Sequence, residues 1–156
     1  MGNPWRRHTA RVLPVDAQGR VLLLHGWDPH RPGEPFWFTI GGAAEAGESM
    51  PQAAARELRE ETGIRVDPEH LGEPIAQSTI EFSWAGHQIT QGQVFYAVLV
   101  ESAEVSLDGL DPWERATTDA YAWLSAEDLE AGQPLADPDL PDLARTAIAT
   151  VRDRPR

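Results

Sequence analysis

The chain has 156 residues, of which 25 are acidic and 13 are basic, so its formal net charge at pH 7 is −12. This length fits one domain with a sizeable core, and we expect residues 1–156 to form a single domain. The negative charge disfavours a nucleic acid polymer as partner, and the absence of cysteine excludes disulfides, a thiolate nucleophile and a zinc site built on sulfur.

No apolar run in the sequence is long enough to cross a membrane, and the first residues lack the apolar core of a secretory signal. We therefore expect a cytoplasmic protein without a membrane partner. A small phosphorylated molecule, bridged to the protein by a metal ion, is compatible with the negative charge.

The N-terminal part of the chain predicts an arm followed by a β-hairpin. Residues 1–8 are expected to form a loose arm. Two apolar runs rich in Val and Leu follow, Thr9–Val15 and Arg20–His25. The residues between them, Asp16–Gly19, are typical of a hairpin turn in which Gly19 takes a positive φ angle.

A loop, a short strand and a helix come next. Residues 26–35 are rich in proline and glycine and predict a loop. Phe36–Ile40 predicts a short strand that leads into a glycine turn at Gly41-Gly42. Ser49 is suited to cap the start of a helix and Gly63 its end, so we predict a helix of about 13 residues between them.

The C-terminal part combines strands and helices. We predict strands at 75–84, 88–100 and 120–124, a polar connection at 101–118, a short helix opened by Ser125 and an amphipathic helix at about 142–152. Strands followed by a helix, and again strands followed by helices, predict an α+β or mixed-sheet α/β fold in which helices cover a central sheet.

Three carboxylates are predicted to share one face of the helix that follows Ser49. Glu57, Glu60 and Glu61 are spaced i, i+3 and i+4. Like charges at this spacing are mildly destabilising unless a cation lies between them, and ligands that are all oxygen favour Mg²⁺ or Mn²⁺. A solvated helix face with ion pairs is the alternative. The glycine turn and Glu48, which a solvated face does not need, favour the metal site.

The most specific pattern in the chain runs from Gly42 to Ile64, GAAEAGESMPQAAARELREETGI. It matches G-x5-E-x7-R-E-U-x-E-E-x-G-U, where U is a bulky aliphatic residue, at every specified position. This pattern is the signature of the Nudix hydrolases, and the chain resembles that family. The resemblance implies an α/β/α sandwich with a mixed central sheet, in which the signature forms a loop, a helix and a loop.

The resemblance also implies an activity. Nudix hydrolases cleave a pyrophosphate bond in a nucleoside diphosphate linked to another group, and they release a nucleotide and a phosphorylated group or pyrophosphate. By resemblance Glu57, Glu60 and Glu61 are metal ligands and proton acceptors, and the carbonyl of Gly41 is a further ligand. The cofactor is Mg²⁺, with Mn²⁺ as an alternative. Which glutamate takes the proton of the attacking water is left open.

Other signature residues are expected to support the site. Gly42 belongs to the turn before the helix, and Glu48 lies in the loop that follows it. Arg56 is expected to be a strut that pairs with Glu60 one turn on or reaches back to Glu48 and holds the loop against the helix.

Residues outside the signature are candidates for further roles. Members of the family often supply one more acidic group from the loop before the last strand, and we select Glu114 for this catalytic role. An acidic loop kept soluble by its charge is the alternative. Arg11, His25 and Trp37 are candidates for substrate binding, with surface solvation or core packing as the alternative.

The expected partner is a small nucleotide or another diphosphate, and a homodimer is left open. ADP-ribose is expected to be a poor substrate, because Ser78, Thr79 and Ile80 stand where some ADP-ribose hydrolases of the family carry a proline. The alternative function is a regulatory module that senses a nucleotide without turnover. Relatives of that kind usually lose signature carboxylates, so the intact glutamates favour an enzyme.

Overall fold

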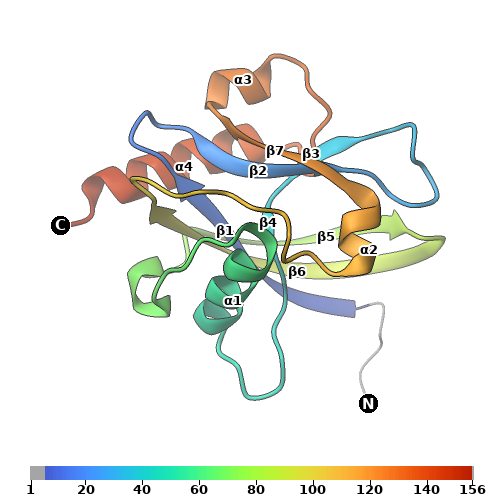
Figure 1. The fold of residues 1–156 in the computed structure, drawn as a ribbon, viewed down its shortest axis with the longest axis horizontal. Coiled ribbons are helices and arrows are strands. Elements are labelled where there is room, and N and C mark those ends of the chain that lie inside the picture. The colour runs from blue at the N-terminus through green and yellow to red at the C-terminus, as the bar shows by residue number, and fades with distance from the viewer. Residues whose placement is uncertain (1–5, 156) are drawn as a thin grey trace.

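A mixed sheet of seven strands forms the centre of the protein, which we describe from a computed structural model covering residues 6–155. Figure 1 shows its course. The strands are β1 (Arg6–Val15), β2 (Val21–Gly26), β3 (Phe36–Phe38), β4 (Ile40–Ala43), β5 (Ala76–Trp84), β6 (His87–Leu99) and β7 (Thr118–Leu124). The helices are α1 (Met50–Thr62), the 3-10 helix η1 (Pro68–Leu71), α2 (Pro112–Thr117), α3 (Ala126–Glu130) and α4 (Leu140–Asp153).

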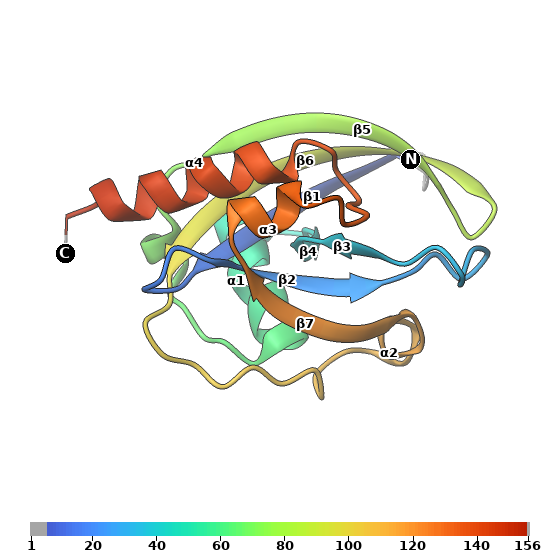
Figure 2. The same cartoon turned by 90° about the horizontal axis from the view of Figure 1, so that it is seen from above.

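The sheet divides into two groups of strands. On one side β1 pairs in parallel with β6, which pairs with β5, and β1 also pairs with β4. On the other side β2 pairs with β3 and β7. The register joins β1 to β2 through Val15 and Val21 alone, so the two groups diverge from that point (Figure 2).

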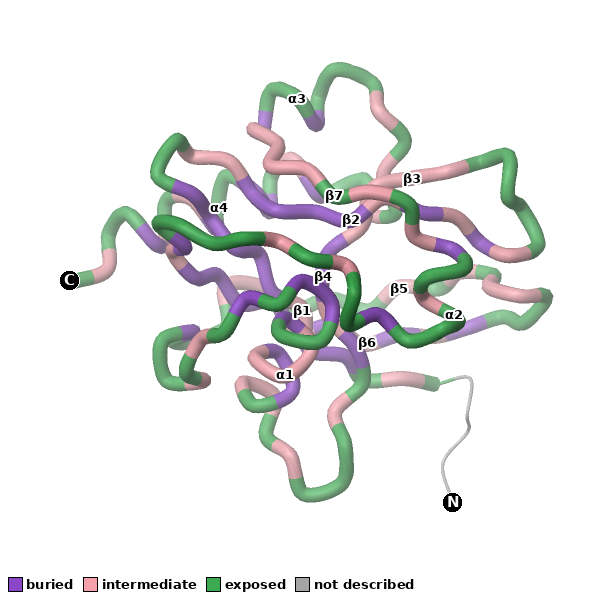
Figure 3. Tube along the Cα trace, in the orientation of Figure 1, coloured by how far each residue is buried: buried purple, intermediate pink, exposed green. Residues whose placement is uncertain are grey.

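Successive side chains of a strand point to opposite faces, so the central strands contribute to two cores. The first core contains Val12 and Leu24 and is covered by α1, whose Leu58 is fully buried. The second core contains Leu13 and Leu23 and is covered by α4. Figure 3 shows the buried residues concentrated along β1 and β2, between these helices. The predicted sandwich, with helices on both faces of a mixed sheet, is confirmed.

Helix α1 has the predicted limits. Ser49 caps its N-terminus in a reciprocal capping box with Gln52, and Gly63 ends it in the left-handed conformation at φ 80°. The capping residues satisfy backbone groups that a helix end leaves without partners, which is why the sequence predicts these limits well.

One expectation for the N-terminal part was wrong, and the predicted hairpin is confirmed only next to its turn, where β1 and β2 pair antiparallel. Residues 6–8 belong to β1 and not to a loose arm, because they pair with Thr90–Gly92 of β6; residues 1–5 lie outside the described part of the chain. The turn at Asp16–Gly19 forms, with Gly19 at φ 74°, but the strands on either side separate directly after it. An extended hairpin is therefore absent here, since each strand finds a better partner elsewhere in the chain.

The polar connection before β7 also differs from the prediction. It contains α2, whose N-cap Asp111 forms a capping box with Glu114, and β7 begins at Thr118. No helix in the part of the chain that the structure covers is both long and apolar enough to span a membrane.

Candidate metal centre

Three carboxylates from two helices converge at one point of the structure. Glu57 and Glu61 come from α1, and Glu114 comes from α2. Each offers an oxygen atom, and these three atoms lie within 4.8 Å of one another. The spacing of i and i+4 places Glu57 and Glu61 on one face of α1, and the start of α2 brings Glu114 to them from a distant part of the chain. We refer to these three residues as the carboxylate cluster.

Gly41 and Gly42 lie in strand β4, paired with β1, and do not form the predicted turn. They make room for the two glutamates of α1. A Cβ atom on Gly42 would lie 2.5 Å from Oε1 of Glu57, and one on Gly41 would lie 2.2 Å from the carbonyl oxygen of Ala10. The backbone N–H of Gly41, at φ 152°, donates a hydrogen bond of 3.0 Å to Oε2 of Glu61. Only glycine therefore allows this close approach of strand and helix. The ligand role expected of the Gly41 carbonyl stays a prediction.

Arg56 links the signature loop to the helix. Its guanidinium donates two hydrogen bonds to the Glu48 carboxylate, at 2.8 and 2.9 Å, and one of 3.1 Å to the carbonyl of Ala43. It also donates to Glu57 at 2.9 Å and to Glu60 at 3.1 Å. The bidentate pair with Glu48 fixes both distance and orientation, so Arg56 occupies the place of a strut.

Glu60 lies outside the carboxylate cluster. Its side chain is 44% exposed, and it pairs with Arg56, one helical turn earlier. The i, i+4 spacing directs Glu60 toward the guanidinium, whereas Glu61 turns inward and is only 3% exposed. The structure thus brings together two of the three glutamates expected on α1 and adds Glu114 to them.

Burial and mutual repulsion oppose the negative charge of the cluster. Burial raises the pKa of Glu61 well above its ordinary value, with Arg11 acting against this and Glu57 and Glu114 adding to it. Burial also raises the pKa of Glu114, to which the charges of Asp111 and Glu57 contribute, while a hydrogen bond from the backbone N–H of Asp111 acts in the other direction. A divalent cation would offset both causes, so the donor set fits a hard metal ion.

Of the substrate-binding candidates, Arg11 lies beside the cluster. Its guanidinium donates a hydrogen bond of 3.0 Å to the hydroxyl of Thr39 and a second bond to the Thr39 carbonyl. It attracts the charges of Glu61 and Glu57. Arg11 is paired with Gly41 across β1 and β4, so it lies next to the glycines that approach α1.

His25 and Trp37 lie together on neighbouring strands. Their ring centroids are 4.8 Å apart, and Nδ1 of His25 is 2.6 Å from Oδ1 of Asp119. Trp37 packs against the second core. Neither ring forms a hydrogen bond or ion pair with the carboxylate cluster, so their expected role in substrate binding stays a prediction.

Two buried glutamines of β6 were not selected from the sequence as candidate site residues. Gln91 and Gln93 are 5% and 6% exposed, and they lie on the face of β6 that Phe95 contributes to the second core. Gln91 donates to Gln93 at 3.0 Å, and Gln93 donates to Ser78 at 3.2 Å. Polar residues at alternate positions of a strand, in register with its buried positions, are the signal that could have revealed them.

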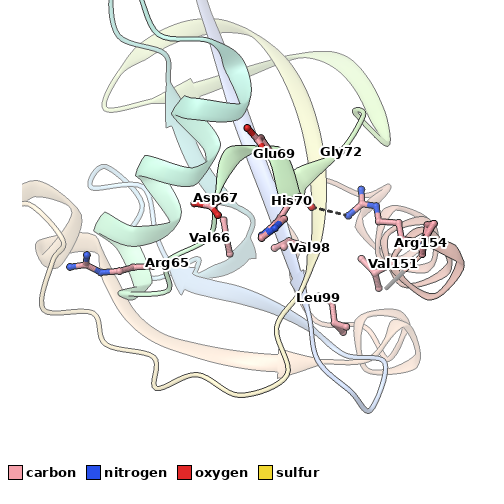
Figure 4. A pocket seen from close by; sticks show the side chains of 11 residues that line it. Arg65, Val66, Asp67, Glu69, His70, Gly72, Val98, Leu99, Val151 and Arg154 are labelled. Carbon is pink, nitrogen blue, oxygen red and sulfur yellow. Dashed lines mark hydrogen bonds between the residues drawn. The ribbon is translucent and has the colours of Figure 1, made fainter.

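A surface cavity of about 860 Å³ lies elsewhere and includes none of the cluster residues. Figure 4 shows it between η1, the end of β6 and the C-terminal end of α4. Arg154 borders it and donates hydrogen bonds to the carbonyls of Ala97 and Leu71, at 2.6 and 2.8 Å. Because three elements meet at this guanidinium, we interpret its role as structural and place the candidate centre at the carboxylates.

Comparisons with known proteins identify the family and the fold. The family model of the NUDIX domain matches residues 5–146. The dihydroneopterin triphosphate diphosphatase of Escherichia coli (strain K12) is 41% identical over 85 residues, which are 53% of this chain and 54% of that protein. The match therefore spans about half the length of this curated relative.

Solved structures share the fold over nearly the whole chain. The MutT protein from Methanosarcina mazei Go1 has a TM-score of 0.65 at 21% identity, with 99% of this chain and 100% of that chain covered. The E. coli dihydroneopterin triphosphate pyrophosphohydrolase has a TM-score of 0.63 at 23% identity, with 92% and 96% covered. At these identities the likeness establishes the fold.

The strut predicts a pH-dependent stability. Hydrogen bonds from Arg56 lower the pKa of Glu48 from 4.5 to about 2. A carboxylate with a depressed folded-state pKa stabilises the protein fully above its unfolded-state pKa and loses this contribution as the pH falls toward the folded-state value. We expect Glu48→Gln to lower the urea midpoint at pH 7, and the difference from the parent to shrink between pH 4.5 and 2.

Glu45→Gln is the control for this variant. Glu45 lies 3.7 Å from the same Arg56, but its side chain is 69% exposed, so its loss should change the midpoint little. Equal midpoints of Glu48→Gln and the parent at pH 7 would show that the strut does not stabilise the fold.

Proposed function

The chain belongs to the NUDIX domain family, and we propose that it hydrolyses a pyrophosphate bond in a nucleoside diphosphate linked to another group, with Mg²⁺ or Mn²⁺ as cofactor. The products are a nucleotide and a phosphorylated group or pyrophosphate. One observation carries the proposal: three carboxylates from α1 and α2 offer oxygen atoms within 4.8 Å of one another, beside Gly41 and Gly42 of β4.

The donor set favours a hard cation. Glu57, Glu61 and Glu114 offer only oxygen, which suits Mg²⁺ and Mn²⁺ and disfavours softer metals. When bound, the ion neutralises phosphate charge and lowers the pKa of a coordinated water. Glu60 is exposed on the adjacent part of α1 and stays a candidate for a further ligand.

The residues of the site would have different roles in metal binding, positioning and proton transfer. Glu57 and Glu61 hold the metal, with Glu61 oriented by the N–H of Gly41. Arg56 fixes the signature loop and keeps Glu57 in place. One of Glu57, Glu60 and Glu114 accepts the proton of the attacking water, because a carboxylate beside the metal is within reach of it.

A small nucleotide or a related triphosphate is the proposed substrate. The name of the E. coli relative points to dihydroneopterin triphosphate as one compound to test. Arg11, His25 and Trp37 are proposed to contact the substrate, Arg11 through its positive charge beside the cluster and the two rings by stacking. A cytoplasmic location stays a prediction from the sequence, and a homodimeric state stays open.

A module that binds a nucleotide without turnover is the alternative. The convergence of the carboxylates favours the enzyme, since binding alone does not require a cluster whose charge is opposed by burial. Incubation with a panel of nucleotides and dihydroneopterin triphosphate, with identification of both products, separates the two functions. Binding without product would support the sensor.

The proposed metal site predicts that hydrolysis requires a divalent ion. We expect hydrolysis to stop in excess chelator and to return with Mg²⁺, and Glu61→Gln to lower kcat/KM by at least about 100-fold, because a ligand of the ion is lost. Glu69→Gln, on η1, is the control and should keep the parent rate. Full activity in chelator would contradict the metal mechanism.

The fold of Glu61→Gln can be checked separately. A carboxylate whose folded-state pKa is raised stabilises the protein below its unfolded-state pKa and loses this contribution as the pH rises through the folded-state value. Without metal at pH 7, the variant should therefore be at least as stable as the parent in thermal unfolding. Mg²⁺ should raise the melting temperature of the parent more than that of the variant.

Glu114 should act on the transition state. We expect Glu114→Gln to lower kcat much more than it raises KM, because a metal or acid–base role does not contribute to uniform substrate binding. The amide oxygen can still accept the hydrogen bond of the capping box, so α2 should persist. Asp108→Asn, whose side chain is 90% exposed, is the control. Parent-like kinetics of Glu114→Gln would remove Glu114 from the site.

Substrate preference is the remaining prediction of this section. We expect kcat/KM for ADP-ribose to be lower than for nucleoside triphosphates, because Ser78–Ile80 stand where some ADP-ribose hydrolases carry a proline and instead form part of β5. Steady-state kinetics with both substrates at equal Mg²⁺ measure the ratio. A higher kcat/KM for ADP-ribose would reverse the preference.

A further inference from the structure

A buried carboxylate joins two loops that are distant in the sequence. Asp28 is 6% exposed and lies in the loop of residues 27–35, between β2 and β3. Its Oδ1 accepts a hydrogen bond of 2.9 Å from the N–H of His30 within the loop. The same atom accepts one of 3.0 Å from the N–H of Ala85, 57 residues away, in the turn between β5 and β6. We call this second contact the clasp.

The turn that receives the clasp has an unusual conformation. Ala85 has φ 51° and is the one non-glycine residue with positive φ in the described chain, and Gly86 follows at φ 82°. A two-residue hairpin turn of this kind needs positive φ at both positions, which is unfavourable for a residue with a Cβ atom. A Cβ on Gly86 would lie 3.0 Å from the His30 ring, so the loop and the turn fit closely.

The clasp lies at the end of the sheet opposite the Val15–Val21 pair, where the two groups of strands have separated. The register contains no pairing of β2 or β3 with β5 or β6. The loop 27–35 continues from His25 and leads to Trp37, whose rings lie together. The hairpin on the other side carries Gln91 and Gln93 on the face of the second core. A hydrogen bond between loop and hairpin therefore limits how far these two pairs of side chains can move apart.

We propose that Asp28 is a positioning residue, and that Gln91 and Gln93 join His25 and Trp37 as substrate contacts. The clasp holds these two pairs at the separation that the substrate requires. This inference rests on the proposed function. The two pairs lie on the face of the second core, whereas the carboxylate cluster is built on α1, which covers the first core. The clasp thus acts on the part of the substrate remote from the reacting phosphates.

The expected kinetic effect follows from this division. The proposed contacts are made equally with the substrate and the transition state, so their loss raises KM and leaves kcat nearly unchanged. For Asp28→Ala we expect KM for a nucleoside triphosphate substrate to rise about tenfold, which corresponds to about 1.4 kcal/mol, with kcat within about twofold of the parent.

Asp16 offers a matched control. It is 9% exposed and accepts hydrogen bonds from the N–H groups of Gln18 and Arg20 in its own turn, at 3.0 and 2.8 Å, and from the Arg20 side chain. Asp16→Ala therefore removes a buried carboxylate that supports a turn without joining it to a distant hairpin. Asp28→Asn keeps an oxygen that can accept both hydrogen bonds and should restore the parent KM.

Hydrogen–deuterium exchange tests the clasp without any substrate. We expect exchange at residues 84–87 to be faster in Asp28→Ala than in the parent, and unchanged in Asp16→Ala and Asp28→Asn. Unchanged exchange at this turn in Asp28→Ala would overturn the clasp. An unchanged KM in Asp28→Ala, or an equal rise of KM in Asp16→Ala, would overturn the positioning role.

The kinetic and the exchange measurements together separate this inference from the proposed function. If the parent hydrolyses no member of the panel, its affinity for a nucleoside triphosphate, measured by calorimetry, replaces KM and should be lower in Asp28→Ala. If the parent neither hydrolyses nor binds a nucleotide, the proposed function fails and the positioning role falls with it. The exchange result would then still decide whether the clasp joins the loop to the hairpin.

Discussion

The close approach of α1 to the backbone of β4 is the constraint on which the site depends. Glu57 and Glu61 reach this position because Gly41 and Gly42 have no Cβ atoms, and any larger residue would collide with the Glu57 carboxylate or with the neighbouring strand. The approach also supplies the N–H of Gly41 to Glu61. A helix held farther away would leave its carboxylates in solvent, where repulsion would be screened and no cluster would form.

The charges around this contact are arranged in two ways. At the strut, the Arg56 guanidinium faces Glu48 and Glu57 and stabilises their negative charge at close range. At the cluster, burial and the approach of like charges oppose ionisation of Glu61 and Glu114. In a chain with a net charge of −12, distant charges do not relieve this cost. The fold therefore keeps acidic groups in a place where a bound cation would offset this cost, which is typical of a functional site.

The sequence predicts those features whose causes lie close together in the chain. The limits of α1 follow from Ser49 and Gly63, and the strut follows from the spacing of Arg56 and Glu48. Features with distant causes were not predictable in this way. Residues 6–8, for example, become strand through β6. Glu60 has a local cause instead, because it pairs with Arg56 four residues earlier and so lies outside the cluster. Glu114 was selected by family resemblance, and the capping box that turns its segment into a helix was overlooked.

The division of the sheet explains why the carboxylates on α1 are easier to predict from the sequence than the side chains on the face of the second core. The two carboxylates on α1 and the strut lie in one continuous stretch, whereas the first core that α1 covers also takes side chains from β1, β2 and β6. On the face of the second core, the side chains next to the clasp come from β2, β3, β5 and β6. The relative positions of these strands depend on the point at which the pairing of β1 with β2 ends. The relative positions of Glu57 and Glu61 are thus encoded locally, whereas Glu114 reaches them from α2, in a distant part of the chain. Recognition of the rest of the substrate, in the proposed function, depends on long-range contacts and can vary with loops and turns without disturbing the metal ligands.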